Sequence, residues 1–322
     1  MPVVRRPPRA SSLVLAPEDP ARLAARVVIR FHLRAFAREE AGARAGDIEA
    51  VHQLRVATRR LRAALRLFAP VLPPRVAAHA RAELRSLGRA IGAVRDLDVL
   101  GAAVMARAAR LDPALRHALG PLGVAIHDER ATAHAALGAT LDGRRFHRLL
   151  DGLAAFAESP APARGDVPLG AIAADLVRPL LRDALRAGRA LGPDAPPAVV
   201  HRARIRVKRL RYALETLRGL GGPAVRKTTV RLARLQERLG EHQDAVTHRT
   251  WLLAYAERPD VPAPTLVAVG ALVQAFDRLA ARRRRRLADR WRRVGRPRRR
   301  RAVLDELSAR RPRAVRLAAT GT

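Results

Sequence analysis

The sequence predicts an all-α protein made of two tandem helical bundles that are related by a pseudo-twofold axis. A basic segment that begins at His52 recurs 149 positions later at His201, with the shared pattern H-x-x-R-[VI]-x-x-[RK]-R-L-R-x-A-L. A second pattern, L-x-x-x-[IL]-G-x-x-x-D, begins at Leu87 and recurs 148 positions later at Leu235. Two motifs in the same order and at nearly the same spacing predict two structurally equivalent halves. No segment alternates between apolar and polar residues as a half-buried strand does.

Start and stop signals divide the first half into helices. Residues 18–45 follow acidic and proline start signals and are amphipathic, which predicts a helix. Asp47 is a good N-cap for the next helix, which carries the first copy of the basic motif and ends near Pro70. Further helices are expected, in chain order, at 74–92, 95–110, 112–137 with an interruption at Gly120-Pro121, and 144–157.

A linker rich in proline, glycine and alanine separates the two halves. Beyond it, helices are expected at 172–191, 197–217, 224–256 and 265–293, with a turn at 219–223. The predicted domain organisation has five parts: a disordered N-terminal arm (1–17), the first helical bundle (18–157), the linker (158–170), the second helical bundle (171–293) and an Arg-rich C-terminal tail (294–322).

The charge of the chain points to a polyanionic partner. The formal net charge is +34 over 322 residues, and 48% of the residues are hydrophobic, which excludes wholesale disorder. Residues 278–322 carry +15 of this charge, so the body of the protein is itself basic at +19. Lys208 and Lys227 are the only lysines. Nearly all of the positive charge is therefore guanidinium, which binds phosphate or carboxylate oxygens in a two-pronged fork.

Several classes of protein are disfavoured by what the sequence lacks. The absence of cysteine removes disulfides and thiolate sites, and the chain has no Walker phosphate loop and no H-E-x-x-H pair. No apolar run approaches the roughly 18–20 residues of a membrane span. The one mixed cluster of histidines and acids, His127-Asp128-Glu129 with His134, has the spacing of an ordinary helix surface. A cytoplasmic protein that is not an enzyme and needs no cofactor is therefore expected.

Helical projection places the basic residues of each motif copy on one stripe and its apolar residues on the opposite side. The first stripe, called the first ladder below, consists of His52, Arg55, Arg59 and Arg62. The second ladder consists of His201, Arg204, Lys208 and Arg211. The apolar sides, which we expect to face the core, contain Leu54, Leu61, Leu65 and Phe68 in the first copy and Ala203, Leu210, Leu214 and Leu217 in the second.

Each ladder has two interpretations. A basic stripe is often only a solvated helix face, but a histidine at the head of both copies favours a ligand with regularly spaced anions. Arg60 and Arg209 project about 80° around the helix from the histidine that heads each copy, and they are expected on a flank. The repeated carboxylates Asp96 and Asp244 are either catalytic or metal-binding groups, or acids that orient a motif arginine. The second interpretation is favoured, because no other acid recurs to complete a metal site.

These motifs resemble those of the CHAD domain family, the conserved histidine α-helical domain. The resemblance lies in residues 51–62 (VHQLRVATRRLR) with 87–98 (LGRAIGAVRDLD), and in residues 201–212 (HRARIRVKRLRY) with 235–244 (LQERLGEHQD). It extends over roughly residues 18–293 and implies two four-helix bundles that face each other across a basic central cavity. It further implies binding of inorganic polyphosphate, with one ladder on each wall. Some members of the family associate with polyphosphate granules. The E-x-E-x-K motif of the triphosphate-hydrolysing domain found in some members is absent here, so hydrolysis is not implied.

Nonspecific binding of nucleic acid is the alternative hypothesis, since a net charge of +34 attracts any phosphate polymer. Aromatic residues make up only 3% of the chain, which offers little surface for stacking on unpaired bases. The arginine runs at 282–286 and 298–301 are either a solvated tail or additional nonspecific contacts to polyphosphate, nucleic acid or an anionic membrane surface.

Overall fold

The computed structural model describes residues 13–159 and 166–309, and within these ranges the regular structure is helical. This confirms the predicted all-α class. The elements of the first half are α1 (Ala21–Arg44), α2 (Ile48–Leu67), η1 (Ala69–Val71), α3 (Pro74–Ala108), α4 (Pro113–His117), α5 (Gly120–Asp142) and α6 (Arg144–Glu158). Those that follow are α7 (Leu169–Arg189), α8 (Pro197–Thr216), η2 (Arg218–Leu220), α9 (Pro223–Ala256), α10 (Ala263–Arg285), α11 (Leu287–Val294) and α12 (Pro297–Ser308).

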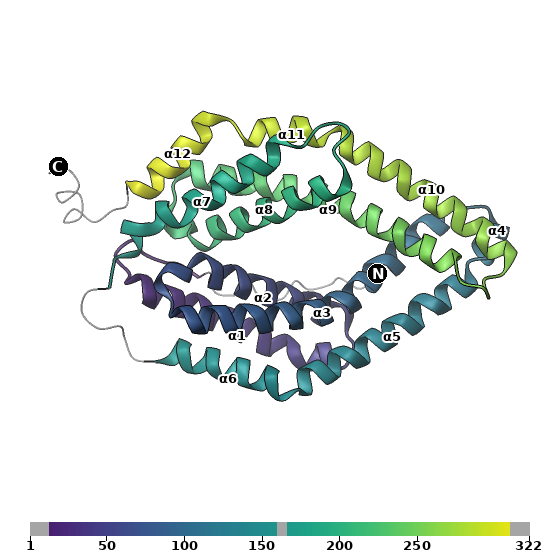
Figure 1. Cartoon of the computed structure of the whole chain (residues 1–322), viewed down its shortest axis with the longest axis horizontal. Coiled ribbons are helices and arrows are strands. Elements are labelled where there is room, and N and C mark those ends of the chain that lie inside the picture. Colours follow the sequence, from purple (N-terminus) through teal and green to yellow (C-terminus); the bar gives the residue numbers. More distant parts are fainter. Residues whose placement is uncertain (1–12, 160–165, 310–322) are drawn as a thin grey trace, which may run out of the picture.

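The helices form two layers, with α2 and α3 in one layer facing α8 and α9 in the other (Figure 1). Each layer contains the same local sequence of elements. The 20-residue helix α2 leads through the turn η1 into the 35-residue helix α3, and the 20-residue helix α8 leads through η2 into the 34-residue helix α9. The layers touch where α2 packs against α8 and where α10 packs against α3, α4 and α5.

Two hydrophobic clusters hold this arrangement together. The larger one includes the inward faces of α1, α2, α7 and α8, and extends to α11 and α12. The smaller one lies at the far ends of the long helices, where Leu100 and Val104 of α3 belong to the same buried cluster as Leu252 of α9 and Phe276 of α10. Both clusters join residues of the two halves, so the two layers share their core at both ends.

The helix α3 differs from the sequence expectation, because it runs unbroken through Gly92 where two helices were predicted. A glycine inside a helix costs only about 1 kcal/mol, and packing of the flanking turns offsets that cost. Gly92 is buried, and its carbonyl accepts a hydrogen bond of 3.3 Å from Arg55 Nη1. The glycine therefore marks close packing against α2, and the helix does not end there.

The described part of the expected linker fastens the two halves together. The Ala21 N–H donates to the Val167 carbonyl at 2.9 Å, and the Leu169 N–H donates to the Asp19 carbonyl at 2.8 Å. These bonds hold the start of α7 beside the start of α1. Residues 160–165 of the linker lie outside the described residues.

The described part of the expected C-terminal tail is a helix that packs on the body of the protein. In α12, Val303 and Leu307 are buried, and this helix contacts α7 and α9. The Glu306 carboxylate accepts hydrogen bonds from the backbone N–H groups of Gly222, Ala224 and Val225 at 3.0, 2.7 and 2.9 Å. Glu306 thus caps the start of α9, which has no side-chain cap of its own. Residues 1–12 of the expected arm and residues 310–322 of the tail lie outside the described residues.

One described segment corrects the expectation that no apolar run approaches the length of a membrane span. Residues Ala263–Val294 contain an 18-residue window with a mean hydropathy of 1.2, which passes the test of length and composition. A core helix that is mostly buried passes the same test, and 28% of this window is buried. Here Leu272 and Phe276 of this segment are buried against the far ends of α3 and α9.

Candidate functional site

The helix α2 presents the first ladder because its opposite face is buried. Asp47 caps the helix as predicted, its side chain accepting a 2.6 Å hydrogen bond from the Ala50 N–H. Leu54, Leu61 and Leu65 are at most 1% exposed, which confirms the predicted core-facing side. Because side chains three and four positions apart share a face, this burial leaves the arginine stripe on the side of α2 away from its own core.

The helix α8 presents the second ladder in the same way. It begins at Pro197, and Ala203, Leu210 and Leu214 are at most 2% exposed. Its cations are half-buried, as are the arginines of the first ladder; they are Arg204, Lys208 and Arg211.

The two ladders meet at Tyr212. The Arg59 guanidinium of α2 lies 5.4 Å from the centre of the Tyr212 ring, and the Arg211 guanidinium of α8 lies 4.8 Å from it. Both distances are within the range of a cation–π interaction. One buried aromatic ring thus brings a cation of each ladder to the same place, although the two helices are about 150 residues apart in sequence.

The cations of the two ladders also interact through their charges. Burial, and then the nearby charges of Arg204, Arg59 and other arginines, lower the pKa of Lys208 from its ordinary 10.5 to about 7. Burial also lowers the pKa of Arg59. The charges of Arg211 and Arg204 of the second ladder lower it further. Since each of these groups senses cations from the facing helix, the two ladders form one electrostatic cluster.

Several cations of this cluster have no anionic partner. Within the described residues, Arg59, Arg62, Arg204 and Lys208 make no ion pair, whereas Arg211 pairs with Glu215 of its own helix at 3.2 Å. The buried Nε atoms of Arg59, Arg204 and Arg211 also lack a hydrogen-bond partner. Buried donors without partners cost free energy, and such groups are concentrated at binding sites.

The repeated carboxylates occupy different positions in the two halves. Asp96 accepts a 2.7 Å hydrogen bond from Arg55 Nη1, which is the contact expected of an acid that orients a motif arginine. Burial raises the pKa of Asp244, while the charge of Arg204 acts in the opposite direction. Asp96 raises it as well, so the two acids of α3 and α9 lie near each other. No group of three or more metal-ligating side chains occurs in the described part of the chain.

The two motif histidines are not equivalent. Burial, and then the charge of Arg95, lower the pKa of the half-buried His52 imidazole. His201 is exposed, and its Nδ1 lies 3.0 Å from Gln243 Oε1. Of the expected flanking residues, Arg60 is exposed, whereas Arg209 is half-buried and lies near Arg206 and Asp183.

Sequence reasoning missed two contributions to the site. Tyr212, which both ladders contact, is the one aromatic residue of the repeated motif and stands where the first copy has Ala63. Gly88 of α3 faces the first ladder, since a Cβ at this position would lie 3.3 Å from Arg62 Nη1. A glycine in the middle of a predicted helix was the available signal for this close approach.

The cluster of histidines and acids on α5 was expected to be an ordinary helix surface. Two of its members contact other helices. Glu129 Oε2 accepts a 3.0 Å hydrogen bond from Trp251 Nε1 of α9, and Glu129 also pairs with Arg258. His134 Nε2 lies 3.0 Å from the Ala43 carbonyl of α1. Glu129 and His134 are therefore engaged in contacts between helices, whereas His127 and Asp128 are exposed.

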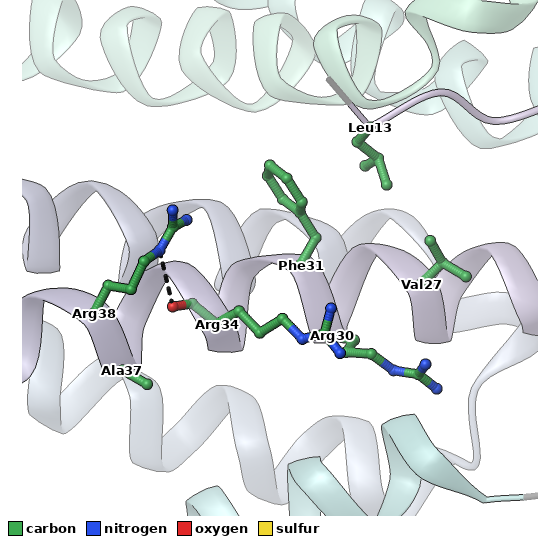
Figure 2. Close-up of a pocket in the computed structure, with 7 residues that line it drawn as sticks. All are labelled: Leu13, Val27, Arg30, Phe31, Arg34, Ala37 and Arg38. Atoms are coloured by element: carbon green, nitrogen blue, oxygen red, sulfur yellow. Dashed lines mark hydrogen bonds between the residues drawn. The ribbon is translucent and has the colours of Figure 1, made fainter. Parts of the chain in front are cut away.

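A groove of about 620 Å³ runs along α1 (Figure 2). Its lining combines the apolar side chains of Val27 and Phe31 with three arginines at four-residue spacing, Arg30, Arg34 and Arg38. Arg30 Nη2 donates to the Ala157 carbonyl, and Arg38 Nε donates to the Arg34 carbonyl at 3.3 Å. No ladder residue lines this groove.

Fold and site together define an all-helical protein whose two layers bring paired cationic ladders face to face. The family model of the CHAD domain matches residues 27–253, and the chain belongs to this family. Membership supports a polyphosphate-related role at the level of the family.

Similarity to individual proteins agrees with this assignment. Two uncharacterised proteins from strains of Mycobacterium tuberculosis, MT2285 and Rv2226, are each 30% identical over 252 residues. The match covers 76% of this chain and 48% of each relative, so the chain spans about half the length of the curated relatives it matches.

Two solved structures share the fold. The crystal structure of the CHAD domain from the plant Ricinus communis has a TM-score of 0.70 and 28% identity, covering 88% of this chain and 96% of that chain. PptA from Streptomyces chartreusis has a TM-score of 0.65 and 23% identity, covering 85% of this chain and 100% of its own. At this identity the second likeness concerns the fold alone.

Proposed function

We propose that the protein binds inorganic polyphosphate, without catalysing its reaction, between the ladders of α2 and α8. The observation that carries this proposal is the cluster around Lys208, in which two cations from each helix are half-buried and make no ion pair within the described residues. Like charges held together in a desolvated place destabilise the free protein. A polyanion between the ladders would offset that cost at several cations at once.

The chemistry of the side chains suits a chain of phosphates. The ladder cations recur about once per helical turn, roughly every 5.4 Å, along each helix. Guanidinium groups form forked, charge-assisted hydrogen bonds to phosphate oxygens, and the partnerless Nε atoms of Arg59, Arg204 and Arg211 are donors for such bonds. Release of counterions would add a driving force that falls steeply as salt rises.

We also propose that the two layers are tandem four-helix bundles related by a pseudo-twofold axis, with a basic cavity between them. Support comes from the matched element lengths, since α2 and α8 both have 20 residues and each precedes a short turn and a helix of 34 or 35 residues. The two copies of the ladder motif occupy corresponding helices of this series. We place the protein in the cytoplasm, at polyphosphate granules, a location that imaging of a tagged protein would test.

Competition for the site tests the proposed function. Long-chain polyphosphate and duplex DNA are titrated at physiological salt and equal phosphate concentration, and polyphosphate should bind more tightly. Replacing Arg55, Arg59, Arg204 and Lys208 with alanine should abolish polyphosphate binding while circular dichroism shows unchanged helicity. The matched control removes four exposed arginines, namely Arg148, Arg182, Arg186 and Arg189, and should retain most of the affinity.

Two outcomes would contradict the proposal. If duplex DNA competes as well as polyphosphate, the protein is a nonspecific polyanion binder, as in the alternative hypothesis. If the ladder variant keeps its affinity, binding takes place elsewhere, with the C-terminal arginines of α10 to α12 as the next surface to examine.

A further inference from the structure

The first ladder is one residue longer than the motif that the two halves share. Arg66 follows Arg62 by four positions and projects within about 20° of Arg55 on the same stripe of α2. Its counterpart 149 positions later is Glu215, which pairs with Arg211 at 3.2 Å. The first half therefore continues the ladder with a cation, whereas the second half ends it with an acid.

The adjacent long helix shows the same asymmetry. Three half-buried or exposed arginines recur every fourth residue on α3; they are Arg81, Arg85 and Arg89. The L-x-x-x-[IL]-G-x-x-x-D motif relates α3 to α9 by 148 positions, so the counterparts on α9 are Thr229, Ala233 and Glu237. We call Arg66, Arg81, Arg85 and Arg89 the exit cluster. Each of its four cations is replaced by a neutral or acidic residue in the other half.

The exit cluster is continuous with the first ladder in space. Burial, and then the nearby charges of Arg85, Arg209 and Arg89, lower the pKa of the Arg62 guanidinium. Burial, and then the charges of Arg209, Arg62 and Arg81, lower the pKa of Arg66 to about 10. The close approach of Gly88 to Arg62 shows that α2 and α3 pack tightly at this point.

Acids do not neutralise the exit cluster. Within the described residues none of its four arginines makes an ion pair, and the one hydrogen bond found is from Arg81 Nε to the Ala77 carbonyl of its own helix. The nearby acid Asp183 is engaged by Arg206 at 3.0 Å.

We propose that the exit cluster is a second anion subsite, through which a polyphosphate chain leaves the ladders on the α2–α3 side only. This inference rests on the proposed function and adds to it a direction and a minimum length. Along α2 the track from Arg55 to Arg66 rises by about 16 Å, and α3 extends it sideways. A chain too short to span this track would engage the ladders alone.

Paired variants test this inference in the full chain. The variant Arg66→Ala/Arg85→Ala should bind long-chain polyphosphate about tenfold more weakly than the wild type, and the slope of log Kd against log salt should fall by about 1–2. Its affinity for tripolyphosphate, relative to the wild type, should change at most about twofold. The matched control, Arg182→Ala/Arg186→Ala, removes the same charge from α7, and its loss should be at most about twofold for both ligands.

The converse exchange gives the second half the cations of the first. The variant Glu215→Arg/Ala233→Arg should bind long-chain polyphosphate more tightly than the wild type, by about threefold or more. Equal losses in the exit and control variants would overturn the inference, because charge alone would then explain them. If the wild type itself fails to bind polyphosphate, the proposed function fails. If the wild type binds polyphosphate and the exit variant binds it equally well, only the inference about the exit cluster fails.

Discussion

At Lys208, a side chain that normally carries a charge is held where a charge is unfavourable. Burial and the neighbouring arginines lower its pKa to about 7. Its ordinary pKa is 10.5, so at any pH between these values the unfolded chain binds more protons at this residue than the folded chain does. The free energy of unfolding therefore rises with pH across this window, and below about pH 7 the destabilisation is fully present.

Replacing Lys208 with methionine should remove this destabilisation. At pH 6–7 the variant should unfold with a free energy about 1–2 kcal/mol higher than the wild type, because an apolar chain of similar length replaces a poorly solvated cation. The gain should shrink as pH rises towards 10, since the wild-type lysine is then neutral in the folded state. Chemical denaturation at several pH values measures this difference. A gain that does not depend on pH would contradict the assigned cause.

At the scale of elements, the start of α9 is capped by α12, a helix that comes much later in the chain. Its first N–H groups are capped by Glu306 of α12, while Val303 and Leu307 of the same helix are buried. Burial alone would raise the pKa of the Glu306 carboxyl. The hydrogen bonds from the backbone N–H groups of Ala224, Val225 and Gly222 nevertheless hold this pKa below its usual value. The stabilisation by this cap is therefore lost as pH falls through the acidic pKa of the folded state.

Removal of this cap should destabilise the fold. Glu306→Ala should lower the free energy of unfolding by about 1–3 kcal/mol at neutral pH, because three backbone donors lose a charged acceptor. The neighbouring Asp305 is exposed and serves as the control, so Asp305→Ala should change the stability by less than about 0.5 kcal/mol. The difference between the two variants should diminish as the pH falls below 4.5, the ordinary pKa of a glutamate carboxyl. Equal effects of both variants at pH 7 would show that α12 contributes only its apolar face.

For the molecule as a whole, hydrophobic clusters at both ends join the two layers, and cations from both layers lie close together at the centre. Tyr212 contacts Arg59 from the facing layer, and Lys208 senses arginines of both ladders. A polyanion that binds both ladders would therefore bridge the layers in the folded state. It would not bind in this way to the unfolded chain. Such a ligand stabilises the folded state in proportion to its differential binding.

Thermal or chemical unfolding with polyphosphate should reveal this bridging. At a free ligand concentration of 100 times Kd, the free energy of unfolding should rise by about 2.7 kcal/mol at 25 °C. The variant Arg59→Ala/Lys208→Ala should lose most of this increase at the same ligand concentration, because each layer would lack a central cation. Full stabilisation of this variant would place the ligand outside the ladders.

The helices and the composition of each ladder were predictable from the sequence, because amphipathic periodicity and capping are local properties. The predicted N-cap and core-facing leucines of α2 are found in the structure, and the family was recognisable from the motif residues. Where local signals misled, packing was the reason. Gly92 lies inside a helix because α2 and α3 pack closely there, and α12 is ordered because Val303 and Leu307 find a core.

Only the tertiary structure decided which cations face one another. Periodicity places a residue on a face of its helix, but it contains no information about the helix that lies opposite. Hence the meeting of Arg59 with Tyr212, the low pKa of Lys208 and the cluster of Arg66 with the arginines of α3 follow from the packing of distant segments. The sequence by itself determined two cationic helices, and the fold placed them close enough to act as one site.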